Sequence, residues 1–131
     1  MPDRPFGLER GSAVVEFALV MPVLLVVMLG MVQVGLMVRD QVIVTQAARA
    51  GAREASVTES AEQVRGAVVS SASGIDPARV AVTVSPAAAL GTSRSVHIEY
   101  DMPISVPFID WLFPPTVGLS ADASMRQEFS A

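Results

Sequence analysis

The chain has 131 residues, of which 51% are hydrophobic, with a formal net charge of −4 and no cysteine. This length permits one small domain beside a membrane helix. The composition excludes a disulfide framework, a thiolate metal site and anchoring through a lipidated cysteine. An acidic balance without runs of Lys or Arg argues against a nucleic-acid-binding surface.

Residues 1–11 contain two prolines, two glycines and four charged side chains of mixed sign. This composition predicts a poor helix and is consistent with a leader peptide. Arg39 and Asp40, beyond the following apolar run, cancel in charge. The positive-inside rule therefore leaves the orientation across a membrane open.

The run from Phe17 to Val38 contains no charged residue and is broken only by Gln33. Because about 20 apolar residues cross about 30 Å of hydrocarbon as a helix, we predict a membrane-spanning helix over residues 12–38. The alternative is a cleaved secretory signal peptide, whose apolar core has about 7 to 15 residues and ends at an Ala-x-Ala-like site. Here the core is longer, and no such site follows it.

Pro22 lies inside this run and has no N–H to donate to the carbonyl of Ala18. We therefore predict a kink or a locally looser helix at this point. One interpretation is that membrane helices simply tolerate proline. The other is that the helix extends or melts locally when it packs into a filament.

Glu16 stands just inside the start of the apolar run, where an ionised carboxylate costs up to a few kcal/mol. A cut between Gly11 and Ser12 would create an ammonium four residues before Glu16. Residues at this spacing face each other on a helix, so the new charge could compensate the carboxylate within the chain or in a neighbour.

The spacing of Gly11, four residues, Glu16 and the aromatic Phe17 resembles the processing site of type IV pilin-like proteins. The longer string from Arg10 to Pro22 resembles the TadE-like family of pseudopilins, from the tight-adherence (Flp) pilus assembly system. The resemblance implies cleavage by a prepilin peptidase after Gly11 and a role for Glu16 and Phe17 in processing or assembly. Flp pilins carry Tyr where this chain has Phe17, which keeps the aromatic ring and loses the hydroxyl.

Beyond Val38 the helical pattern continues to about Ser56, and Ala47, Gly51 and Ala55 fall on one ridge. Small residues on a ridge allow another element to approach closely. The partner is either the chain's own sheet or a neighbouring subunit. The segment around this ridge, from Ala47 to Arg53, also resembles a second signature of the TadE-like family, and its two arginines are expected to form a solvated edge.

Ser60 and Gln63 have the form of a capping box, and apolar residues at helical spacing follow as far as Ser73–Gly74. The period then changes to two, which predicts strands over residues 80–84, 96–104 and 119–128. We therefore predict an α+β fold. A long transmembrane helix continues into a second helix packed on a small, antiparallel three-stranded sheet, in a pilin-like domain over residues 39–131.

Titratable residues that could form a catalytic or metal site are few. His97 is predicted to face the polar side of its strand as a surface histidine. Glu99, Asp101 and Asp122 could bind a hard cation such as calcium, but alternating acids on a solvated face are common. We therefore expect no enzyme activity, no cofactor, no metal and no small-molecule substrate.

Trp111 lies in a dense apolar cluster, whose other members are Phe108, Ile109, Leu112 and Phe113. The simpler interpretation is a cap over a small core, and the alternative is a contact with a partner or a membrane surface.

The resemblance implies that the protein is a minor pseudopilin or assembly subunit. It would lie in the cytoplasmic (inner) membrane, with its domain outside the cytoplasm. Its partners would be the prepilin peptidase, other pilus subunits and the assembly platform. The alternative is an uncleaved, signal-anchored binding domain that never enters a fibre. An extracytoplasmic enzyme would require a deep pocket that gathers His97 with the acids of the sheet.

Overall fold

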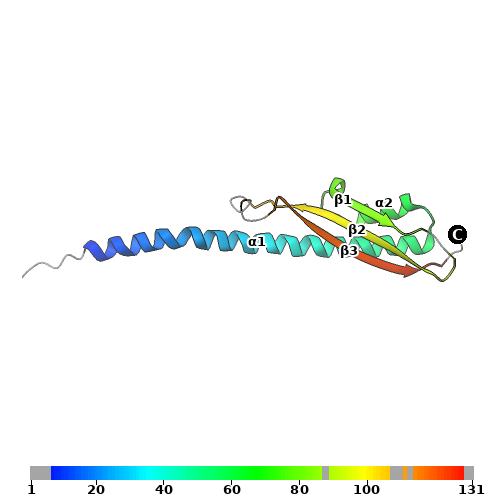
Figure 1. The fold of residues 1–131 in the computed structure, drawn as a ribbon, viewed down its shortest axis with the longest axis horizontal. Coiled ribbons are helices and arrows are strands. Elements are labelled where there is room, and N and C mark those ends of the chain that lie inside the picture. Colours follow the sequence, from blue (N-terminus) through cyan, green and yellow to red (C-terminus); the bar gives the residue numbers. More distant parts are fainter. Residues whose placement is uncertain (1–6, 87–88, 107–110, 112–113, 129–131) are drawn as a thin grey trace, which may run out of the picture.

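The computed structural model describes residues 7–86, 89–106, 111 and 114–128. In chain order the elements are α1 (Gly7–Val57), α2 (Ala61–Ser71), the 3₁₀ helix η1 (Pro77–Arg79), β1 (Val80–Val84), β2 (Ser93–Pro103) and β3 (Thr116–Arg126). The N-terminal half of α1 stands apart from the rest of the molecule, and its C-terminal half packs against the sheet (Figure 1). The predicted α+β arrangement is confirmed.

The predicted span and the helix that follows it are one element of 51 residues, which continues through Pro22. α1 begins at Gly7, so residues 7–11 are helical, although their composition predicted a poor helix. Leu, Glu and Arg at positions 8–10 are good helix formers. Extending an existing helix also costs far less than starting one, so the apolar run can carry the helix back past Gly11.

α2 begins with the predicted cap, because the Ser60 hydroxyl accepts a hydrogen bond from the backbone N–H of Gln63 at 3.4 Å. The second half of the box differs from the expected form. The backbone N–H of Ser60 donates to the Thr58 hydroxyl at 3.3 Å, and that hydroxyl donates to the side-chain oxygen of Gln63. Thr58 thus relays the contact that a capping box makes directly.

The three strands form an antiparallel sheet in the order β1-β2-β3. Ile98 in the central strand faces Val82 of β1 on one side and Ala121 of β3 on the other. The inward side chains of β2 alternate as the period of two predicted, with exposed fractions of 4% or less at Val96, Ile98, Tyr100 and Met102.

The core lies between this face of the sheet and the two helices (Figure 1). α1 contributes mostly small residues, α2 contributes valines, and the strands contribute larger side chains. The members from the helices are Val44, Ala47, Ala48, Ala52, Ala55, Val64 and Val68. Small residues on α1 bring the helix close to the sheet, so a thin core suffices for this short chain.

Candidate functional site

The N-terminal half of α1 that stands apart from the sheet is called its free half. It carries all the predicted processing residues, which are exposed: Gly11, Ser12, Glu16 and Phe17. The Ser12 hydroxyl donates a hydrogen bond to Oε1 of Glu16 at 3.2 Å, which joins residues four apart on one face of the helix. The structure therefore brings together the two residues that the sequence paired. The peptide bond between Gly11 and Ser12 lies inside the helix.

Beyond Glu16 the free half of α1 is apolar on every side. Among the described side chains from Gly11 to Val32 none is buried, and Phe17 and Leu19 are exposed to 62% and 70%. The helix is long and apolar enough to cross a membrane by length and composition. An exposed apolar surface of this size marks a contact with lipid or with other subunits.

The small-residue ridge at Ala47, Gly51 and Ala55 is buried within the chain itself. A Cβ at Gly51 would lie 2.5 Å from Cγ2 of Val68 in α2 and 3.2 Å from Cγ1 of Val96 in β2. The ridge thus lets α2 and the sheet approach α1 closely.

On the outer face of the sheet, His97 bridges two carboxylates. Its Nδ1 lies 2.6 Å from Oδ1 of Asp122, and its Nε2 lies 3.3 Å from Oε1 of Glu99. The hydrogen bond with Asp122, followed by that with Glu99, raises the pKa of His97 above its ordinary value of 6.5.

This cluster is open to solvent, with the Asp122 and Glu99 side chains 74% and 69% exposed. Within the described ranges no group of three or more His, Cys, Asp or Glu residues could hold a metal ion. The calcium alternative at Glu99, Asp101 and Asp122 is therefore not supported, and the cluster is an ion-paired surface.

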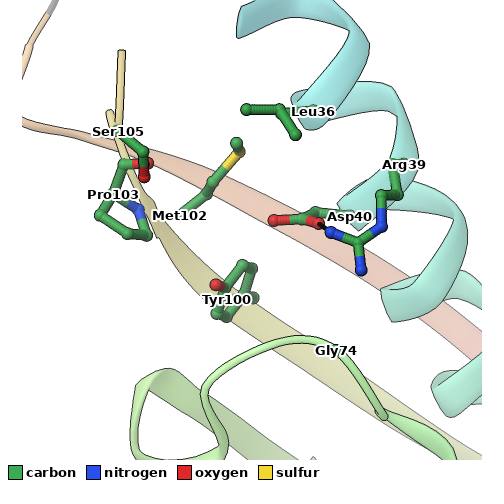
Figure 2. Close-up of a pocket in the computed structure, with 8 residues that line it drawn as sticks. All are labelled: Leu36, Arg39, Asp40, Gly74, Tyr100, Met102, Pro103 and Ser105. Atoms are coloured by element: carbon green, nitrogen blue, oxygen red, sulfur yellow. Dashed lines mark hydrogen bonds and ion pairs between the residues drawn. The ribbon is translucent and has the colours of Figure 1, made fainter. Parts of the chain in front are cut away.

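A pocket of about 200 Å³ lies where the free half of α1 meets the sheet (Figure 2). Asp40 is 7% exposed, and its Oδ1 lies 3.7 Å from Nη1 of Arg39. Arg39 lies over Gly74, whose φ is +99° and where a Cβ would come within 2.8 Å of the guanidinium. Leu36, Tyr100, Met102, Pro103 and Ser105 complete the lining.

Sequence reasoning treated Arg39 and Asp40 as flanking charges and missed the burial of Asp40. The available signal was spacing, since Asp40 lies four residues after Leu36 and four before Val44, on the inward ridge of α1. Arg39 and Asp40 are the charged groups of this small open pocket, and its other polar side chains are Tyr100 and Ser105.

Arg94 at the start of β2 is a second residue that the sequence did not single out. It is 3% exposed, and its guanidinium binds backbone carbonyls at the end of α1, with Nη1 donating to Ala55 at 3.2 Å and Nη2 donating to Glu59 at 3.3 Å. It also donates to the carbonyls of Thr58 and Ser85. Because the last turn of α1 contains no basic residue, Arg94 provides the positive charge that complements this helix end.

Trp111 is 74% exposed, so it is not a buried cap over the core. The other members of its predicted cluster, Phe108, Ile109, Leu112 and Phe113, lie outside the described residues.

Comparison with known proteins agrees with the resemblance found in the N-terminal sequence. No curated protein and no solved structure matches the chain. Residues 11–53 match the model of a family described as TadE-like protein. This stretch contains the proposed scission point, the exposed apolar helix and most of the buried ridge. The segment from Gly11 to Arg53 is therefore TadE-like.

Proposed function

We propose that this chain is a minor pseudopilin or assembly subunit of a Tad (Flp) pilus system, without enzyme activity. The TadE-like segment supports association with Tad pilus systems, and the long apolar helix suggests a membrane anchor. In this proposal the anchor lies in the cytoplasmic membrane, and the sheet domain faces away from the cytoplasm. A prepilin peptidase removes residues 1–11.

The observation that carries this proposal is the contact between Ser12 and Glu16, which lies within the matched segment. Cleavage after Gly11 replaces the neutral Ser12 amide with an ammonium on the residue that already contacts Glu16. Opposite charges at this spacing attract, and in a low-dielectric surrounding the attraction is stronger than in water. The cleaved helix can therefore place Glu16 at the edge of hydrocarbon at a lower cost, either with its own ammonium or with that of a neighbouring subunit.

A specific observation also favours the uncleaved, signal-anchored binding domain. The Gly11–Ser12 peptide bond lies inside α1, so a peptidase must first open the helix around it. In this second function the helix is only a tether, and the domain binds a partner without entering a fibre.

N-terminal sequencing of the mature protein, expressed with its prepilin peptidase, separates the two functions. If the protein is a processed pseudopilin, the first residue should be Ser12. If it is an uncleaved, signal-anchored domain, the first residue should be Met1 or Pro2. We expect Glu16→Gln, which keeps the shape and removes the charge, to abolish processing or assembly while membrane insertion is unchanged. Glu62→Gln, at an exposed position in α2, is the matched control and should assemble normally. Normal piliation with Glu16→Gln would contradict the role given to the carboxylate.

A further inference from the structure

The uncovered part of α1 is as long as a bilayer core is thick. Every described side chain from Gly11 to Val32 is exposed or half-buried, and burial begins at Gln33, which is 1% exposed. This uncovered segment of about 22 residues spans about 33 Å at 1.5 Å per residue, against about 30 Å of hydrocarbon. If the uncovered segment fills the bilayer, the boundary between hydrocarbon and headgroups falls near Gln33. It does not fall at Val38, where the apolar sequence ends.

The end of the sheet where β2 leads into β3 lies beside the part of α1 that follows Gln33. Leu36, one turn after Gln33, lines a pocket together with Pro103 and Ser105, where the connection from β2 to β3 begins. The base of this connection is closed by a hydrogen bond from the backbone N–H of Ile104 to the carbonyl of Pro115 at 3.2 Å. Figure 1 shows that this end of the sheet points towards the free half of α1.

Trp111 lies within this connection and is 74% exposed. Tryptophan is enriched at the membrane–water interface, because its ring is amphipathic and its indole N–H remains near water. The Arg39 side chain, at the same end of the sheet, is 58% exposed and can reach lipid phosphates along its aliphatic stem.

We propose that the end of the sheet marked by Ile104, Trp111 and Pro115 docks on the bilayer, with the Trp111 ring in the headgroup region, so that the domain sits on the membrane without a stalk. The occupant is the phospholipid interface, because any bilayer that fills the uncovered segment brings its headgroups to the level of Leu36, which lines one pocket with Pro103 and Ser105 at this end of the sheet. The proposal requires α1 to span the bilayer, and it requires neither cleavage nor pilus assembly.

The chain has one tryptophan, so its fluorescence reports this contact directly. The full-length protein is reconstituted in phosphatidylcholine vesicles that contain lipids spin-labelled either near the headgroup or near the end of the acyl chain. We expect the shallow label to quench Trp111 about twice as strongly as the deep label, and aqueous acrylamide to quench it weakly.

The matched control places the reporter at the other end of the sheet, in a variant with Trp111→Phe and Leu90→Trp. Leu90 is 63% exposed and precedes the start of β2, a strand of eleven residues that is about 35 Å long. Its tryptophan should be quenched by acrylamide and by neither lipid label.

Two results would overturn the proposal. Equal acrylamide quenching of both reporters, without quenching by lipid, means that Trp111 stands off the bilayer. Shielding of Trp111 that fades as the protein is diluted in the vesicles means that a second copy covers it. Extraction at alkaline pH reports insertion of α1 separately, and N-terminal sequencing tests the pilus proposal independently of both.

Discussion

Arg94 and His97 are polar residues on the same strand with opposite environments. Arg94 is buried, and its guanidinium binds the carbonyls that end α1. His97 lies on the outer face between two solvated carboxylates. A buried guanidinium deprived of its acceptors leaves both partners unsatisfied, whereas water replaces the partners of an exposed ion pair. Substitution of Arg94 should therefore change the free energy of unfolding. The ion pairs of His97 mainly change the pKa of its own imidazole.

Arg94→Lys should lower the free energy of unfolding by about 2–4 kcal/mol. Lysine keeps the charge, but one ammonium cannot reach carbonyls on both sides of the planar guanidinium. Urea unfolding of the detergent-solubilised protein measures the change. Arg65→Lys, at an exposed position in α2, is the control and should stay within about 0.5 kcal/mol of the parent. Equal stability of the two variants would contradict the capping role.

The single histidine should titrate above pH 6.5, because Asp122 and Glu99 favour its charged form. A raised pKa in the folded state contributes stability that is fully present below 6.5 and is lost as pH rises through the folded pKa. Asp122→Asn should lower the pKa of His97 more than Glu99→Gln does, since Asp122 is the larger cause. NMR titration measures the pKa of His97 in the parent and in the two variants. A larger decrease with Glu99→Gln than with Asp122→Asn would contradict the geometry.

At the scale of the element, α1 carries two different surfaces along one rod. Its first part exposes large apolar side chains, and its later part buries a ridge of small ones. The change occurs inside the apolar sequence, at Gln33, the one polar residue that interrupts it. The two surfaces require different substitutions to test them.

Gly51→Ala should destabilise the domain although alanine is the better helix former. The new Cβ would lie 2.5 Å from a methyl of Val68, which is fully buried and cannot move freely. Overpacking costs about 1–3 kcal/mol, and alanine recovers about 1 kcal/mol in helix propensity. Gly66→Ala in α2 meets no atom within 4 Å and should stabilise the protein by about 0.5–1 kcal/mol. Thermal unfolding followed by circular dichroism should give shifts of opposite sign for the two variants.

The strands and both helices follow from local patterns in the sequence. The alternation of Val96, Ile98, Tyr100 and Met102 is visible along the chain, and the structure buries all four. Arg94 continues the same alternation, but its charge suggests an exposed position. Its burial depends on carbonyls 35 to 39 residues away, which no local pattern reveals. Helix at residues 7–11 was missed because propagation from a stable neighbour outweighs local composition.

At the scale of the whole molecule, the domain uses α1 only from Gln33 onward. The side chains described before it are not buried, so they contribute nothing to the core. Leu36 and Met37 pack against the core at the end nearer the free half of α1, and Asp40 lies in the pocket with Leu36. The buried part of α1 therefore begins inside the apolar run.

A soluble fragment of residues 33–131 should fold, and a fragment of residues 41–131 should be weaker by about 1–3 kcal/mol, because it lacks the partly buried Leu36 and Met37. Urea unfolding of the two fragments measures the difference. Equal stability would show that residues 33–40 of α1 do not support the domain.

The uninterrupted course of α1 has a mechanical consequence. With no joint between anchor and sheet, the orientation of the anchor dictates the orientation of the domain. A lean of about 20° from the bilayer normal would carry Val57, at the far end of α1, sideways by about 12 Å relative to Gln33. If α1 spans a bilayer, a tilt of its segment beyond Pro22 therefore turns the sheet with it.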